Sequence, residues 1–114
     1  MTELDLRANS LVGTLPTELG LLVDLSQLKL GTNILSSSVP TELGELTGIS
    51  SWITLHSNQL TGAVPTQLGR MTKIQAGFYA AAGPNKFNGS VPTEFGRLSE
   101  LEGYFSVASN SFEG

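Results

Sequence analysis

The chain has 114 residues, a net charge of -4, and a composition that is 39% hydrophobic but only 14% charged. Its 6 Lys and Arg residues are too few for the clustered basic face that nucleic-acid binding needs, so we expect no nucleic-acid partner. No apolar run approaches the roughly 18 residues of a membrane span, so this segment is not expected to contact a membrane. The absence of cysteine excludes disulfides, thiolate nucleophiles and zinc–thiolate sites.

The sequence repeats itself four times, and a fifth copy begins before the last residue. After an asparagine, the copies read SLVGTLPTELG, ILSSSVPTELG, QLTGAVPTQLG and KFNGSVPTEFG. A fixed period is typical of a solenoid, in which one coil cannot bury its apolar side chains alone and neighbouring coils stack. We therefore predict one repeat array over residues 1–114, with about four repeats plus a partial fifth and no capping sequence, as in a fragment of a longer array.

Two apolar periods alternate along each copy. Apolar residues precede each asparagine by five and three positions, as Leu28 and Leu30 precede Asn33, and this period of two predicts a short strand with one buried face. After each proline the apolar step becomes three, as in LGELTGI from Leu43, which predicts 3₁₀ or loose helical turns. The prolines fit the first position of such a turn, where no N–H is needed: Pro16, Pro40, Pro65 and Pro92.

The asparagines fall where each predicted strand ends and the chain turns into the interior. A side-chain amide can donate to and accept from the backbone groups that a buried turn leaves unpaired. We therefore predict a structural asparagine ladder: Asn9, Asn33, Asn58, Asn85 and Asn110. Four residues later, Gly13, Gly62 and Gly89 suit a positive φ. Ser37 replaces glycine in the second copy, so we expect that corner to be built differently.

Extra residues lie beside the predicted strands of copies three to five. Ile49-Ser-Ser-Trp-Ile53 is one residue longer than Leu25-Ser-Gln-Leu28, and two further residues lie in the segment AAAGP before Asn85. We interpret the extra residues as β-bulges at the ends of the strands. In an alternative alignment of the fourth copy, Ala80 and Ala82 belong to the strand and the whole insertion precedes it.

The repeat L-x-x-L-x-L-x-x-N-x-L-x-x-x-Ψ-P-x-x-L-G, where Ψ is apolar, resembles the leucine-rich repeat family. Its second half resembles the plant-type subclass of receptor-like kinases, receptor-like proteins and polygalacturonase inhibitors, over essentially the whole chain. The resemblance implies an α/β solenoid, namely a right-handed horseshoe segment with a short parallel β-sheet on the concave face and 3₁₀ or irregular turns on the convex face. It also implies a segment of an extracellular or cell-surface recognition protein that binds a protein or peptide, with flanking repeats or caps in the full protein.

No catalytic constellation is visible in the sequence. His56 is the single histidine, and the matching carboxylates Glu18, Glu42 and Glu94 follow prolines, where they suit the positive end of a helical turn better than a catalytic pair. We therefore expect no enzymatic activity, no metal site and no cofactor in this chain, although a kinase or other catalytic domain could belong to a longer parent protein.

The resemblance places the residues between the strand leucines on the concave face. The candidate binding residues there are Trp52, Thr54, His56, Tyr79, Tyr104, Asp5, Arg7 and Lys29. Exposed aromatic residues are favoured binding anchors, but the extra residue before the strand could equally turn Trp52 and Tyr104 inward to fill a wider coil. His56 is interpreted as a solvated strand residue rather than as a pH switch.

Three alternatives remain open at this stage. Asn88-Gly89-Ser90 is an N-glycosylation sequon, which makes Asn88 a possible modification site in the secretory pathway. The chain could instead be a structural spacer in a longer array, with the ligand bound elsewhere. A minor alternative is an ice- or surface-binding ladder formed by the residues after the prolines, although helix-start chemistry also explains them: Thr17, Thr41, Thr66 and Thr93.

Overall fold

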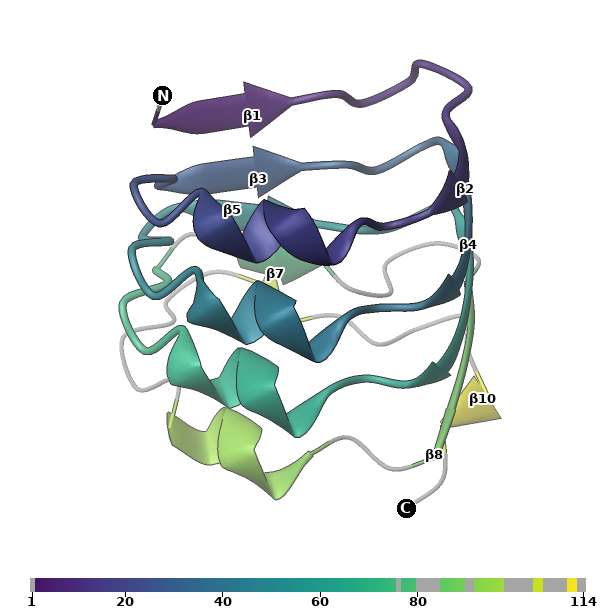
Figure 1. Cartoon of the computed structure of the whole chain (residues 1–114). Coiled ribbons are helices and arrows are strands. Elements are labelled where there is room, and N and C mark those ends of the chain that lie inside the picture. The colour runs from purple at the N-terminus through teal and green to yellow at the C-terminus, as the bar shows by residue number, and fades with distance from the viewer. Residues whose placement is uncertain are drawn as a thin grey trace.

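The structure is a computed structural model of the chain and describes residues 2–75, 77–79, 85–89, 92–97, 104–105 and 111–112. Each complete coil contains a strand, a second strand and a short 3₁₀ helix, and the coils stack so that elements of one kind lie along one side of the molecule (Figure 1). The elements, in chain order, are β1 (Glu3–Asp5), β2 (Val12–Thr14), η1 (Thr17–Leu21), β3 (Gln27–Lys29), β4 (Ile34–Ser38), η2 (Thr41–Glu45), β5 (Trp52–Thr54), β6 (Gln59–Ala63), η3 (Thr66–Arg70), β7 (Gly77–Tyr79), β8 (Lys86–Gly89), η4 (Thr93–Arg97), β9 (Tyr104–Phe105) and β10 (Ser111–Phe112).

The strands form two parallel sheets. The first sheet has the order β1-β3-β5-β7-β9, and it contains the strands that precede the asparagines, as predicted. The second sheet has the order β10-β8-β6-β4-β2 and follows the asparagines. The repeat pattern predicted the first sheet and the helical turns, but not the second sheet. The L-x-G-x-[LV] alternation after each asparagine was the available signal for the second sheet.

The register of the first sheet decides the alignment of the fourth copy. Trp52 pairs with Gly77, and Thr54 pairs with Tyr79. β7 therefore takes the place predicted by the first alignment, and the two further residues of copy four lie between β7 and Asn85. Ala80 and Ala82, which the alternative alignment placed in the strand, lie outside the described residues.

The second sheet is staggered by two residues in each coil. Val12, three positions after Asn9, pairs with Ile34, which follows Asn33 directly. The same offset recurs where Ser36 pairs with Gln59 and Thr61 pairs with Lys86. Each strand of this sheet is therefore parallel to the one before it and offset from it by the same two residues.

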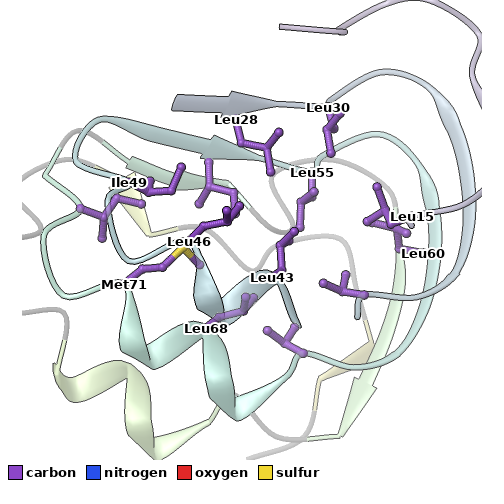
Figure 2. Close-up of a cluster of buried hydrophobic side chains, with 14 of the residues drawn as sticks. Leu15, Leu28, Leu30, Leu43, Leu46, Ile49, Leu55, Leu60, Leu68 and Met71 are labelled. Carbon is purple, nitrogen blue, oxygen red and sulfur yellow. The ribbon is translucent and has the colours of Figure 1, made fainter. Parts of the chain in front are cut away.

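Leucines from all three sides of the solenoid meet in one core. Figure 2 shows side chains from the first sheet, the second sheet and the helices converging on the same interior, including Leu28, Leu55, Leu60, Leu43, Leu46 and Met71. Several leucines of the first coil, including Leu4, Leu6 and Leu11, are only partly buried, because that coil has a neighbour on one side only. This difference follows the expected rule that a coil buries its apolar residues between two neighbours.

The helical turns are 3₁₀, as the three-residue apolar step predicted. The N–H of Leu46 donates to the carbonyl of Leu43 at 3.2 Å, and the N–H of Ile49 donates to Leu46 in the same way at 3.2 Å. One detail of the prediction was wrong: Pro40 lies before the first helical residue, with an extended conformation (φ -68, ψ 142). Helix-start capping by threonine is also wrong, because the Thr41 hydroxyl donates instead to Glu42 Oε1, at 3.2 Å.

Positive φ angles mark the same corner in every described coil. Gly13, Gly62 and Gly89 have φ values of 94, 76 and 75, as predicted. Ser37 also adopts a positive φ, of 63, so the expectation that its corner is built differently was wrong. Stacking against neighbouring coils fixes the shape of this corner, and Ser37 accepts the steric cost of a left-handed conformation.

Candidate binding face on the first sheet

The asparagine ladder fixes the ends of the first-sheet strands. Asn33 Nδ2 donates to the carbonyl of Leu6 at 2.9 Å and to that of Leu30 at 3.0 Å, while its Oδ1 accepts from the N–H groups of Asn9 and Leu11, each at 3.0 Å. Asn58 similarly binds the Leu35 N–H and the Leu30 carbonyl. The predicted ladder is thus confirmed for these two residues.

Asn33, Asn58 and Asn85 each donate to a carbonyl of the preceding coil. Asn85 accepts from the N–H of Leu60 at 3.0 Å and donates to the carbonyl of Leu55 at 2.9 Å, both in the third coil. Asn9 is exposed and donates to the carbonyl of Arg7 within its own coil. Asn110 lies outside the described residues. The ladder therefore has a direction, pointing from each coil back toward the N-terminus.

Trp52 faces outward from the first sheet. Its neighbour Ile53 is fully buried in the core, and alternate residues of a strand point to opposite faces. Trp52 is half-buried and belongs neither to the buried core cluster nor to the partly buried residues described as packing against it. The inward alternative is therefore wrong for Trp52. The side chains of Tyr79 and Tyr104, on β7 and β9, lie outside the described residues.

Two successive N–H groups just before β5 share one carbonyl of the second coil. The N–H groups of Ser50 and Ser51 both donate to the carbonyl of Ser26, at 3.2 and 3.1 Å. The N–H groups of Ser26 and Gln27 share the carbonyl of Thr2 in the same way, although their coil has no extra residue. The pattern therefore does not distinguish the longer coil, and the bulge at the extra residue stays a prediction.

The middle of the first-sheet face is uncharged at neutral pH. Thr54 is only 7% exposed, and its hydroxyl oxygen has no hydrogen-bond partner within the described part of the chain. His56 is half-buried against Gly31, where an added Cβ would lie 2.7 Å from each ring nitrogen. Burial first, and the charge of Arg7 second, lower the pKa of His56 below its ordinary value of 6.5. His56 is thus packed more closely than the predicted solvated residue.

Charged side chains gather at the N-terminal end of this face and pair with one another. Arg7 donates from Nε to Asp5 Oδ1 at 2.8 Å and from Nη2 to Asp5 Oδ2 at 2.6 Å. These hydrogen bonds are the main reason that the pKa of Asp5 falls to about 2. Lys29 Nζ lies 3.2 Å from Glu3 Oε1. The candidate residues Asp5, Arg7 and Lys29 are therefore present on the face as balanced ion pairs.

The remaining candidate sites lie on other surfaces. Asn88 is exposed on β8 of the second sheet, and its glycosylation stays a prediction. Within the described ranges, no group of three or more His, Asp or Glu side chains could hold a metal ion. No helix among the described residues is long and apolar enough to cross a membrane.

Comparisons with known proteins agree with the repeat pattern. The profile of the Leucine Rich Repeat family matches residues 1–22. The BIR2 ectodomain from Arabidopsis thaliana is similar at a TM-score of 0.87 and 33% identity, over 97% of this chain and 56% of that chain. A search of curated protein sequences found no match.

Two further solved structures bear on function. The Arabidopsis receptor kinase HAESA, in complex with the peptide hormone IDA and the co-receptor SERK1, has a TM-score of 0.84 and 32% identity, over 95% of this chain and 18% of that chain. A plant ice-binding protein has a TM-score of 0.83 and 29% identity, over 98% of this chain and 35% of that chain. This chain spans just over half of the BIR2 structure and smaller shares of the other two. Because the family profile and the similar structures agree with the repeat pattern, the chain belongs to the leucine-rich repeat proteins, in the plant-type subclass.

Proposed function

We propose that this chain is a non-catalytic docking scaffold that binds a protein or peptide segment on the outer face of its first sheet. The observation that carries the proposal is the outward position of Trp52, half-buried beside Thr54 and His56 and outside the core. Large aromatic side chains near the centre of a surface dominate the free energy of many interfaces, because they bury much apolar area with few rotatable bonds.

The chemistry of the surrounding face supports this assignment. The charged residues at one end are already paired, while the centre offers an indole ring and a neutral imidazole. The face is held rigid by the asparagine ladder and by strand pairing, so little conformational entropy is lost when a partner docks. The receptor kinase HAESA, similar over most of this chain, has been solved with a peptide hormone and a co-receptor, which supports a partner of this kind.

The experiment is a selection of binding peptides from a displayed random library on the immobilised full chain, followed by affinity measurement with Trp52→Ala. We expect Trp52→Ala to weaken binding at least about tenfold, equivalent to about 1.4 kcal/mol or more, and to leave the melting temperature within error. Lys73→Ala, at an exposed position of the third coil, is the matched control and should bind as the unmodified chain does.

The spacer alternative makes the opposite prediction. If the coils only separate other parts of a longer array, Trp52→Ala should lower stability or change nothing, and no selected peptide should depend on it. Either result would overturn the assignment of the first-sheet face.

A second candidate function is ice binding. Two observations favour it: the similarity to a plant ice-binding protein over 98% of this chain, and a second sheet whose outward side chains are mostly small and uncharged. Measuring thermal hysteresis, the gap between the melting and freezing temperatures of an ice crystal, tests this candidate directly. A chain that leaves this gap unchanged at millimolar concentration would exclude it.

A further inference from the structure

We infer that the ice-contacting surface is the outer face of the second sheet and not the threonine row beside the helices; this inference rests on the ice-binding candidate above. We call this surface the second-sheet face. It consists of the outward-facing described residues of four strands: Val12, Thr14, Ile34, Ser36, Ser38, Gln59, Thr61, Ala63, Lys86 and Asn88.

The second-sheet face is exposed because every strand presents one side to the core and the other to solvent. Leu35, Leu60 and Phe87 point inward and are at most 5% exposed. The residues on either side of them along the strands face outward, and all of the second-sheet face is exposed except Ser36, which is half-buried. The face is therefore open to a ligand without any rearrangement of the chain.

The second-sheet face is almost free of charge. Among its described residues, Lys86 alone is charged. The other two sides of the solenoid differ: the first sheet carries the ion pairs of Glu3 and Asp5, and the helix side carries the Glu45–Arg70 pair. A charged group holds its hydration shell strongly, and removing or reordering that shell is costly. A neutral face is thus the one that complements a lattice of neutral water molecules.

The hydroxyls of the second-sheet face are available to an external partner. Within the described ranges, the hydroxyls of Thr14, Ser38 and Thr61 form no hydrogen bond with the protein, and Ser36 makes one long contact, of 3.4 Å, to the Gly13 carbonyl. The threonine row beside the helices is different, since each hydroxyl donates to the side chain of the next residue, as Thr17 does to Glu18 at 2.8 Å. A hydroxyl that already donates to a neighbouring side chain contributes less to binding water in a fixed array.

The arrangement of these groups is regular in two directions. Neighbouring strands lie about 4.8 Å apart, and alternate residues along a strand lie about 6.7 Å apart. The constant two-residue stagger brings Thr14, Ser36 and Gln59 into one row and Ser38, Thr61 and Lys86 into the next. Parallel rows of mostly small polar groups, repeated from coil to coil, match a repeating surface better than they match a single flexible ligand.

Apolar groups complete the second-sheet face at its N-terminal edge. Val12 is 72% exposed and pairs in register with Ile34, which is 42% exposed. In the second and third coils, Ser36 and Thr61 occupy the position of Val12, three residues after the asparagine. In the third coil, Gln59 occupies the position of Ile34, directly after the asparagine. Methyl groups beside hydroxyls do not compete for water hydrogen bonds, and burying them against a solid surface is favourable.

The test uses ice itself as the probe and the full chain. We measure thermal hysteresis and inhibition of ice recrystallisation for Ser38→Lys combined with Thr61→Lys, which are register partners on the second-sheet face. Thr41→Lys combined with Thr66→Lys is the matched control, because it adds the same two charges to the same two coils on the helix side. We expect at least about a fivefold loss of activity for the first pair and unchanged activity for the control.

Each outcome decides a different question. Equal losses in both pairs, or a loss in the control alone, would overturn the second-sheet face while leaving ice binding in place. An inactive unmodified chain would remove the ice-binding candidate together with the inference, and retention on insoluble cellulose in place of ice would assign the face to a polysaccharide surface. Circular dichroism melting confirms that each variant is folded, and Thr61→Lys alone carries the same expectation if the pair is unstable.

Discussion

Asn58 shows how one side chain can satisfy backbone groups in two coils. Its amide nitrogen donates to the Leu30 carbonyl of the second coil and to the Leu55 carbonyl of its own, each at 3.1 Å. Its oxygen accepts the Leu35 N–H at 3.0 Å. Asn58 is itself only 6% exposed, so water cannot replace the lost amide freely. Asn58 therefore stabilises the fold mainly by supplying hydrogen bonds to backbone groups that would otherwise be buried without a partner.

Asn58→Ala should lower the free energy of unfolding by at least roughly 1–3 kcal/mol, because each buried backbone group left without a hydrogen bond costs about that much. Urea denaturation followed by circular dichroism measures the loss. Asn9→Ala is the matched control, since the Asn9 side chain is exposed and its amide donates within its own coil, to the Arg7 carbonyl. Similar losses for the two variants would contradict the role assigned to the ladder.

Residue-level predictions from the sequence succeeded where a single side chain must meet a fixed chemical need. The asparagines and the glycine corners are of this kind, because a buried turn requires an amide and a positive φ tolerates few residues. Ser37 shows the limit, since its unfavourable conformation comes from the stacking of whole coils and not from its own preference. Trp52 shows another limit, because the sequence left open whether the extra residue before β5 turns this side chain inward or outward, and the burial of its neighbour Ile53 decides between them.

At their glycines, neighbouring 3₁₀ helices lie too close together for any side chain larger than hydrogen to fit between them. A Cβ added at Gly44 in η2 would lie 2.5 Å from the carbonyl oxygen of Gln67 in η3. Gly20 and Gly69 meet Glu42 and Glu94 of the next helix in the same way. The spacing on the helix side of the solenoid thus depends on these glycines.

Gly44→Ala should destabilise the chain by about 1–3 kcal/mol, because the contact is with backbone that cannot move without separating η2 and η3. Thermal melting by differential scanning calorimetry measures the change. Thr47→Ala, an exposed substitution just after η2, should leave the melting temperature nearly unchanged. A Gly44→Ala variant as stable as this control would show that the two helices can separate at little cost.

The strands and turns with an unbroken apolar period were predicted from the sequence, whereas the second-sheet strands, in which the period is interrupted, were not. The first-sheet strands and the 3₁₀ turns keep their periods of two and three over their whole length. The second-sheet strands contain a residue of positive φ, as β6 does at Gly62, and turn signals of this kind conceal a strand. The second-sheet face was missed for the same reason.

On the scale of the whole molecule, stability should depend on pH through its single histidine. The folded chain holds the pKa of His56 below its ordinary value of 6.5, chiefly through burial. Between that lowered value and 6.5 the unfolded chain binds more protons than the folded chain, so stability rises with pH across this window. Stability is therefore lost as the pH falls below about 6.5.

His56→Gln should flatten the dependence of the unfolding free energy on pH between neutrality and mildly acidic solution. Urea denaturation of both proteins at several pH values measures this slope, and proton NMR of the unmodified chain gives the pKa of its one imidazole directly. Parallel slopes, or an imidazole pKa at or above 6.5, would contradict the burial of His56 against Gly31.

The whole fold was easier to predict than either candidate face. Repetition fixes the solenoid, because each copy must bury the same leucines against its neighbours. The binding residues follow no such rule, since Trp52 and Thr61 occupy positions that differ in every copy. Function at these positions therefore has to be argued from what surrounds each side chain.

The direction of the asparagine ladder has a consequence during synthesis. The carbonyls just after β1, β3 and β5 each accept from the asparagine of the following copy, and Asn33 lies 24 residues after Asn9. A coil leaving the ribosome therefore completes these hydrogen bonds only after the next asparagine has also emerged. Ordering of the nascent chain should trail translation by one full repeat, so a pause before that asparagine emerges would leave the newest coil incompletely bonded.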